Sequence, residues 1–233
     1  MHLLPLGATE PHGPHAPLAT DTIISVGICT RAAERLRGEI DVLVLPTIPY
    51  GVTRYGADFP GAISIGADTL RTLVTEVCET FERVVLVNSH LEPEQVRTLR
   101  ELGRPLFDVT RRHVAERLTE EFRAGAGHAG RYETSLVLAD HPELVNEERM
   151  RTLEAMMVDM PAAIRSGQTS FVAMGMDQAY AGSPAEATPE EGEETFAALT
   201  DMLVELIREV GGVGSPEPPG SGGAGFASAG AGK

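Results

Sequence analysis

The 233-residue sequence contains no tryptophan, only two cysteines and no long apolar run. Cys29 and Cys78 lie within apolar helical patterns, which indicates two buried thiols in a reducing cytoplasm and not a disulfide framework. No apolar run reaches the roughly 18–20 residues of a transmembrane helix, and no charged segment precedes a short apolar stretch as in a signal peptide. The sequence therefore predicts a cytoplasmic protein without a membrane anchor.

Basic residues are scarce, with 19 Lys and Arg against 34 Asp and Glu, so the net charge is −15 at pH 7. A surface of this sign repels phosphate groups, and neither nucleic acid nor an anionic membrane is expected as a partner. Several catalytic patterns are also missing: the Gly-x-x-x-x-Gly-Lys phosphate loop, the Gly-x-Ser-x-Gly turn, the Cys-x-x-Cys pair and the His-Glu-x-x-His motif. These absences argue against phosphate-loop and serine-nucleophile enzymes.

Predicted strands and helices alternate along the chain. Apolar runs predict strands over 3–7, 41–46, 62–65, 84–87 and 105–109. Periodic patterns predict helices over 22–37, 68–82, 94–102, 111–123, 131–139 and 190–210, with residues 147–165 helical in part. This alternation is typical of an α/β fold with a largely parallel sheet. We expect one domain over residues 1–210 and a disordered Gly/Pro/Ser-rich tail over 211–233.

Side chains that commonly bind metals follow two of the predicted strands. Glu10, His12 and Asp21 come after the first strand, and His90 and Glu92 come after the strand at 84–87. Ligands in parallel sheets bind beyond the carboxyl ends of the strands, so these residues are expected to share one site.

Each of these residues also has an ordinary structural interpretation. Asp21, or Thr20 before it, can cap the following helix, and Glu92 can be a favourable charge in a first helical turn. Glu10 can be a surface carboxylate, and the histidines can be hydrogen-bonded loop residues. The residues alone therefore leave both a metal site and purely structural roles open.

Mixed carboxylate and imidazole ligands suit Zn²⁺, Mn²⁺ or Fe²⁺. Two ions roughly 3.5–4 Å apart need a shared carboxylate and about two further ligands each, a number that the five residues supply. Such a pair lowers the pKa of a bridging water towards about 7, and a nearby His or Glu can pass the proton to a leaving nitrogen. The predicted chemistry is metal-assisted hydrolysis of a C–N bond by a metal-bridging hydroxide.

Several blocks of the sequence are similar to those of a known enzyme family. Residues 4–15, Leu-Pro-Leu-Gly-Ala-Thr-Glu-Pro-His-Gly-Pro-His, resemble the signature of the creatininase (creatinine amidohydrolase) family. Residues 59–61, 87–90 and 128–135 resemble three further blocks in the same order. The resemblance extends over residues 3–210 and implies a three-layer α/β/α sandwich, in a family whose members form homo-oligomers, often hexamers.

The resemblance also implies a set of metal ligands. One ion would be bound by Glu10, Asp21 and His90. The other would be bound by His12, the bridging Asp21 and a further carboxylate. In creatininase that carboxylate lies two residues after the histidine, a position that is Glu92 in this sequence. Glu133 is the alternative.

Catalytic and substrate-binding residues follow from the resemblance too. It implies that His128 is the acid–base or substrate-binding histidine, and Glu133 in the same block is the second candidate catalytic residue. Ser64 falls near a position that contacts substrate in creatininase. Arg54 and Arg131, if directed into the site, would favour a carboxylate-bearing substrate such as a peptide C-terminus.

Three functions remain open at this point. The first is a metal-dependent amidohydrolase for a small cyclic amide, formamide or related C–N bond. The second is a peptidase in the maturation of a modified peptide, and the third is a metal-retaining protein without catalytic activity. Creatininase places tryptophans around its substrate, and this chain has none, so creatinine itself is not the expected substrate.

Overall fold

The computed structural model describes residues 1–212, and a four-stranded parallel sheet runs through its centre. The strands are β1 (His2–Leu6), β2 (Leu43–Val44), β3 (Val84–Asn88) and β4 (Leu106–Asp108), in the order β2-β1-β3-β4. β1 and β3 are central, and Leu6 pairs with Asn88 at their carboxyl ends. The loops that follow these two strands therefore start side by side.

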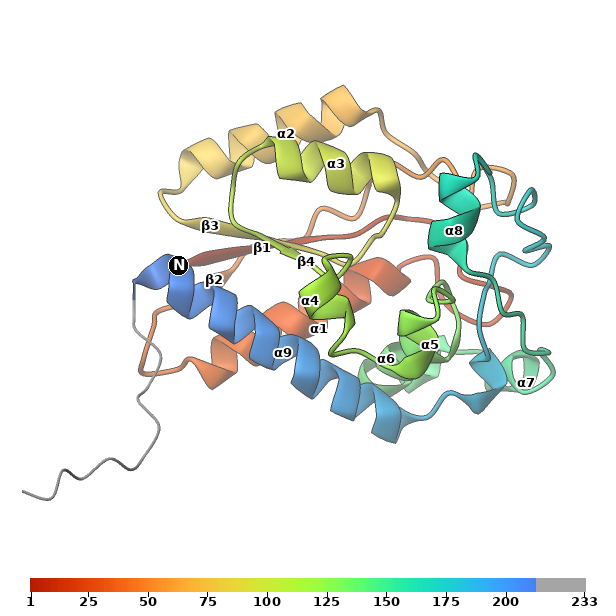
Figure 1. Cartoon of the computed structure of the whole chain (residues 1–233). Coiled ribbons are helices and arrows are strands. Elements are labelled where there is room, and N and C mark those ends of the chain that lie inside the picture. Colours follow the sequence, from red (N-terminus) through yellow and green to blue (C-terminus); the bar gives the residue numbers. More distant parts are fainter. Residues whose placement is uncertain (213–233) are drawn as a thin grey trace, which may run out of the picture.

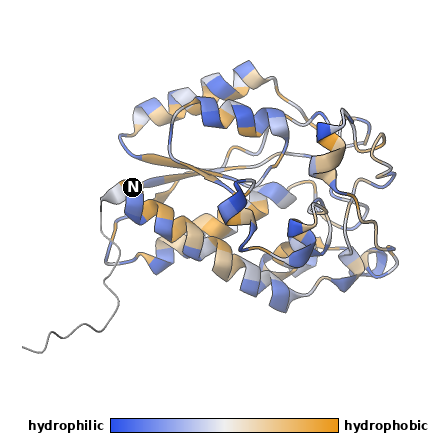
Figure 2. Cartoon of the chain, viewed as in Figure 1, coloured by the Kyte–Doolittle hydropathy of each residue, from blue (hydrophilic) through white to orange (hydrophobic). Residues whose placement is uncertain are grey.

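Helices cover both faces of the sheet (Figure 1). On one face lie α2 (Ala67–Thr80) and α3 (Pro93–Glu101), and on the other lie α1 (Thr20–Arg35) and α9 (Pro189–Gly211). Leu3 and Val85 pack into the core beneath α1 and α9, whereas Leu4 and Leu86 pack beneath α2 and α3. The apolar residues of the helices face the strands (Figure 2). The predicted α/β/α sandwich is confirmed.

The remaining helical segments surround the carboxyl edge of the sheet. They are α4 (Arg112–Ala115), α5 (Glu120–Arg123), α6 (Arg131–Asp140), η1 (Pro142–Leu144), α7 (Glu147–Met150), α8 (Met160–Arg165) and η2 (Pro184–Glu186). Among residues 1–212, no helix combines the length and the apolar character needed to cross a membrane. Cys29 and Cys78 are buried free thiols, as predicted.

Some predicted boundaries were wrong. The strand expected over 41–46 is reduced to two residues, and residues 62–65 form only isolated bridges from Ile63 to Thr9 and from Ser64 to Gly51. The helix expected over 111–123 is broken in two, because the Thr119 hydroxyl accepts a hydrogen bond from the Phe122 N–H and starts a new helix. Beyond Gly212, the predicted tail lies outside the described residues.

The predicted helix cap at Asp21 or Thr20 was also wrong. Helix α1 begins at Thr20, whose hydroxyl donates to the Pro17 carbonyl at 2.8 Å, and no side chain caps the helix. Asp21 therefore lies inside the first turn of α1. Its carboxylate is free to face the loops at the carboxyl edge of the sheet.

Close packing of α6 on α9 depends on Gly192, because a Cβ atom there would collide with the Ser135 carbonyl oxygen. We expect Gly192→Ala to destabilise the protein by about 1–3 kcal/mol, the usual cost of overpacking. Helix propensity alone would predict a gain of about 1 kcal/mol, so the sign of the change separates the two effects. Urea unfolding measures it, with Glu194→Ala on the exposed face of α9 as control; equal stability of the two variants would contradict the packing argument.

Candidate metal centre

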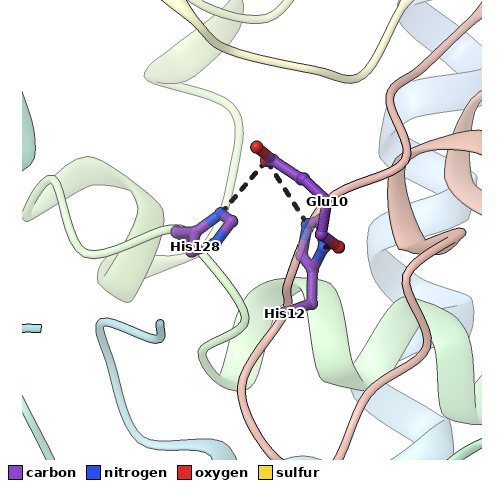
Figure 3. Close-up of side chains that lie close together, drawn as sticks. All are labelled: Glu10, His12 and His128. Carbon is purple, nitrogen blue, oxygen red and sulfur yellow. Dashed lines mark hydrogen bonds and ion pairs between the residues drawn. The ribbon is translucent and has the colours of Figure 1, made fainter. Parts of the chain in front are cut away.

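Three segments of the chain meet at the carboxyl edge of the sheet. The loop after β1 carries Glu10 and His12, and the loop after β3 carries His90. The turn before α6 carries His128, and Glu133 lies in the first turn of that helix. All of these side chains are buried, and Figure 3 shows His128 and His12 directed at Glu10.

Asp21 occupies the centre of this group, because its two carboxylate oxygens face different histidines. Asp21 Oδ1 lies 3.4 Å from His12 Nε2, and Oδ2 lies 3.0 Å from His90 Nδ1. Glu10 Oε1 is 3.2 Å from His90 Nδ1, and Glu133 Oε2 is 3.4 Å from His12 Nε2. The carboxylate of Asp21 is thus placed to be shared between two neighbouring sites.

Backbone carbonyls orient the histidine rings. The Nδ1–H of His12 donates to the Glu10 carbonyl at 3.0 Å, and the Nε2–H of His90 donates to the Val52 carbonyl at 2.7 Å. With one proton held on the far side of each ring, the other nitrogen faces the carboxylates and can bind either a proton or a metal ion. This arrangement is typical of metal-binding histidines.

The donor atoms fit divalent cations. Glu10 Oε2, His12 Nε2 and Asp21 Oδ2 are buried and make no hydrogen bond within the described part of the chain, which is costly unless another partner satisfies them. Three overlapping sets of atoms each lie within 4.8 Å of one another: Glu10, Asp21 and His90; His12, Asp21 and Glu133; and Glu10, His12 and His128. Two such sets that share Asp21 are what a pair of ions requires.

Electrostatics in the metal-free centre also favour positive charge. Burial opposes charge on His12, but the carboxylates of Asp21, Glu133 and Glu10 raise the pKa of His12 to about 10. Burial likewise opposes charge on His90, yet Glu10 and Asp21 raise the pKa of His90 well above its usual value. In the absence of metal, protonated His12 and His90 therefore balance the charge of the carboxylates. Bound metal ions would take over that role.

The pKa shifts imply a pH-dependent metal affinity. At low pH the histidines are protonated and cannot bind metal. The affinity for metal ions should therefore rise with pH as long as the pH is below about 10, the pKa of His12. We expect the apparent affinity for Zn²⁺ to increase by up to about tenfold per pH unit for each proton displaced. Competition with a chromophoric chelator from about pH 6 to about pH 8 measures this, and a flat profile after correction for the chelator would contradict it.

Of the two carboxylates considered for the second ion, only Glu133 faces His12. Glu133 also accepts a hydrogen bond from the Ala129 N–H at 2.7 Å, and Ala129 adopts a left-handed conformation with φ of 50°. Glu92 is turned away and accepts hydrogen bonds from the N–H groups of Arg54 and Tyr55, both at 3.3 Å. The geometry therefore favours Glu133 as the ligand.

A matched pair of variants tests this choice. Glu133→Gln should lose one of two metal equivalents, because it removes a carboxylate from the set with His12 and Asp21. Glu92→Gln should keep both equivalents. Elemental analysis of the purified variants decides between them, and the opposite pattern would return Glu92 to the metal site.

The three residues predicted to contact substrate lie elsewhere. Arg54 pairs with Glu94, and Arg131 pairs with Glu191 and, at 3.4 Å, with Glu186. Ser64 is exposed, and its Oγ accepts a hydrogen bond from the Thr53 N–H at 2.9 Å. None of the three lines the cavity over the metal centre, so the geometry does not favour these predictions.

The sequence analysis did not identify the cavity itself, which has a volume of about 420 Å³. Its inner end is formed by Glu10, Asp21, His90, His128 and Glu133, and its walls are largely apolar, with Phe122, Met160, Ile164 and Phe171 among them. Phe171 also stacks on His128, with the ring centres 4.4 Å apart. Phe122, Met160 and Ile164 lie in segments predicted to be helical, but a helical pattern does not show which apolar residues border a cavity.

Residues 1–207 match the family model described as "Creatininase: Creatinine amidohydrolase". The chain belongs to the creatininase family. It is 35% identical over 216 residues to a mycofactocin precursor peptide peptidase of Mycobacterium ulcerans, covering 88% of this chain and 83% of that one. It is 29% identical over 243 residues to a creatinine amidohydrolase of Pseudomonas putida, covering 89% and 88%.

Solved creatininase structures are also similar to this chain. A mutant creatininase of the Zn–Zn type has a TM-score of 0.66 at 25% identity, and a structure described as creatininase Mn has a TM-score of 0.65 at 26% identity; each match covers 90% of both chains. This member of the creatininase family is a metal-dependent amidohydrolase that acts on C–N bonds. The predicted enzyme class is therefore confirmed, and the alternative of a non-catalytic binding protein is not supported.

Proposed function

We propose that this creatininase-family enzyme hydrolyses an amide bond within a peptide. The observation that carries the proposal is the cavity of about 420 Å³ above the metal centre. Cavities of roughly 300–1,000 Å³ bind ligands of drug-like size, and a small cyclic amide would fill only part of this one. Its apolar walls suit the side chains that flank a scissile peptide bond.

The likeness to named relatives supports a peptide substrate. The peptidase from M. ulcerans acts, by its name, on a precursor peptide, and it is more similar to this chain than the P. putida creatinine amidohydrolase, at 35% against 29% identity. The absence of tryptophan also fits a substrate other than creatinine.

We assign Glu10, Asp21 and His90 to one divalent ion and His12, Asp21 and Glu133 to the other. Zinc or manganese fits these donors and agrees with the related structures. Two such ions would polarise the scissile carbonyl and make water a nucleophile at neutral pH. The chain supplies the carboxylates that balance their charge.

Proton transfer falls to His128. Its Nε2–H donates to the Pro11 carbonyl at 3.0 Å, which leaves Nδ1 free at 3.8 Å from Glu10 Oε1. Burial, together with the nearby His12, lowers the pKa of His128 to about 4, so the ring is neutral at pH 7. The unprotonated Nδ1 lies at the cavity floor, where we assign it to take up a proton during the reaction and return it to the leaving nitrogen.

The test is a substrate screen with the purified, metal-loaded full chain. Synthetic peptides, creatinine, formamides and lactams are incubated with the enzyme, and products are identified by mass spectrometry. We expect cleavage of peptides and no turnover of creatinine. Turnover of creatinine or lactams alone would overturn the peptide assignment and favour the second candidate, a small cyclic-amide hydrolase, which the family description and the P. putida relative favour.

Other features stay predictions from the sequence and its family resemblance. They are a single domain over residues 1–210, a cytoplasmic location, a homo-oligomer as large as a hexamer, and no nucleic-acid or membrane partner. The net charge of −15 supports the last of these. Light scattering on the purified protein measures the oligomer directly.

A further inference from the structure

Two arginines line the cavity and have no acidic partner among residues 1–212. Arg123 ends α5 and Arg165 ends α8, and both are exposed where they border the cavity. Neither guanidinium forms an ion pair with a carboxylate anywhere in residues 1–212. Most other described arginines do have such a partner, including Arg54 and Arg131.

A few further arginines, among them Arg149, also lack an ion pair within the described part of the chain, but they lie outside the cavity lining. Position therefore distinguishes Arg123 and Arg165. In a chain with 34 acidic and 19 basic residues, these two arginines place positive charge on the cavity wall, where Asp159 is the exposed acidic neighbour and accepts a hydrogen bond from the Ala162 N–H at 2.8 Å.

The two arginines belong to one continuous wall. The Met160 N–H, at the start of α8, donates to the Gly125 carbonyl just beyond the end of α5, at 3.1 Å. Phe122 and Ile164, the residues immediately before the two arginines, line the same cavity. The cavity thus combines the buried acidic residues of the candidate metal centre, apolar wall residues, and an exposed border where the two arginines lie with Asp159.

We propose that Arg123 and Arg165 form a subsite for a carboxylate of the substrate, an inference that rests on the proposed peptide hydrolysis. A peptide whose scissile amide lies at the metal centre would place its apolar side chains against the middle of the cavity. A carboxylate further along the peptide would then reach the arginines. Guanidinium groups bind carboxylates through paired hydrogen bonds, which gives orientation as well as affinity. The carboxylate is either the C-terminus of the peptide or an Asp or Glu side chain.

Four fluorescent peptides of one sequence test the subsite. They have a free or an amidated C-terminus, combined with Glu or Gln at the penultimate position. Dissociation constants from fluorescence anisotropy and initial-rate kinetics are measured for the full-length wild type, Arg123→Gln and Arg165→Gln. Arg149→Gln, in an exposed and unpaired arginine outside the cavity, is the matched control.

We expect each cavity variant to raise Kd and KM about three- to tenfold for carboxylate-bearing peptides, with kcat unchanged. The peptide with neither carboxylate should bind all variants equally. If amidating the peptide abolishes the difference between variants and wild type, the arginines bind the C-terminal carboxylate. If replacing Glu by Gln in the peptide abolishes it, they bind the Glu side chain.

Equal changes for all four peptides, or none for any, would overturn the subsite. If the arginines serve only to stabilise the C-terminal ends of their helices, the variants will lower Tm without discriminating between peptides. The carboxylate subsite and the proposed peptide hydrolysis can fail separately. Cleavage of all four peptides without discrimination by charge would rule out the subsite alone. Charge-dependent binding without any cleavage would rule out the peptidase assignment alone.

Discussion

Replacing Asp21 by alanine should remove both metal ions and abolish hydrolysis. Asp21 is shared by the set with Glu10 and His90 and the set with His12 and Glu133, and its two oxygens face the two histidine rings. Metal ions contribute several kcal/mol to transition-state stabilisation, so kcat/KM should fall by at least about a thousandfold. Elemental analysis and the substrate assay of the purified variant measure both effects.

The control for this prediction is Asp177→Ala, an exposed aspartate outside the cavity, which should keep both metals and full activity. Asp21→Asn keeps the shape of the side chain and separates loss of charge from a packing defect. Two metal equivalents retained by Asp21→Ala would rule out the shared carboxylate and leave two independent sites or a different bridge.

Replacing His128 by glutamine should leave the metals in place and slow turnover. The ring contributes a free Nδ1 at the cavity floor, and its pKa of about 4 leaves the ring neutral at pH 7, with an available lone pair on Nδ1. General acid–base catalysis contributes roughly 10²- to 10⁴-fold, so kcat should fall by about that factor. The kinetic assay is combined with elemental analysis and with circular dichroism, which checks the fold.

His113→Gln, at an exposed position of α4, is the matched control and should leave kcat unchanged. The informative contrary result is loss of a metal equivalent from His128→Gln. Since His128 lies within 4.8 Å of Glu10 and His12 in one of the overlapping sets, that loss would reassign it as a ligand and not as the proton-transfer group.

The placement of the metal centre was predictable because it depends on local patterns. Strands β1 and β3 are short apolar runs, and parallel neighbours end at the same edge of a sheet. Side chains that directly follow two such strands, like those of Glu10 and His90, are brought together by the sheet itself. The family motif added His128 and Glu133, which no strand pattern would have joined to them.

Other features depended on contacts between distant segments and were not predictable. Glu92 is only two residues from His90, yet the N–H groups of Arg54 and Tyr55 satisfy its carboxylate, whereas Glu133 reaches His12 from a helix far along the chain. The sequence also contained no sign that Arg123 and Arg165 are the arginines that border the cavity.

The sequence by itself determined the α/β class, the family and the residue types of the metal centre, because strand periodicity and compact motifs are properties of neighbouring residues. Only the tertiary structure decided which carboxylate faces His12, and that Arg123 and Arg165, not Arg54 and Arg131, border the cavity. The physical reason is that a charged side chain turns towards whichever partner the fold brings within a few ångströms. For Arg54 and Arg131 those partners are glutamates, and for Arg123 and Arg165 we infer that the partner is the substrate.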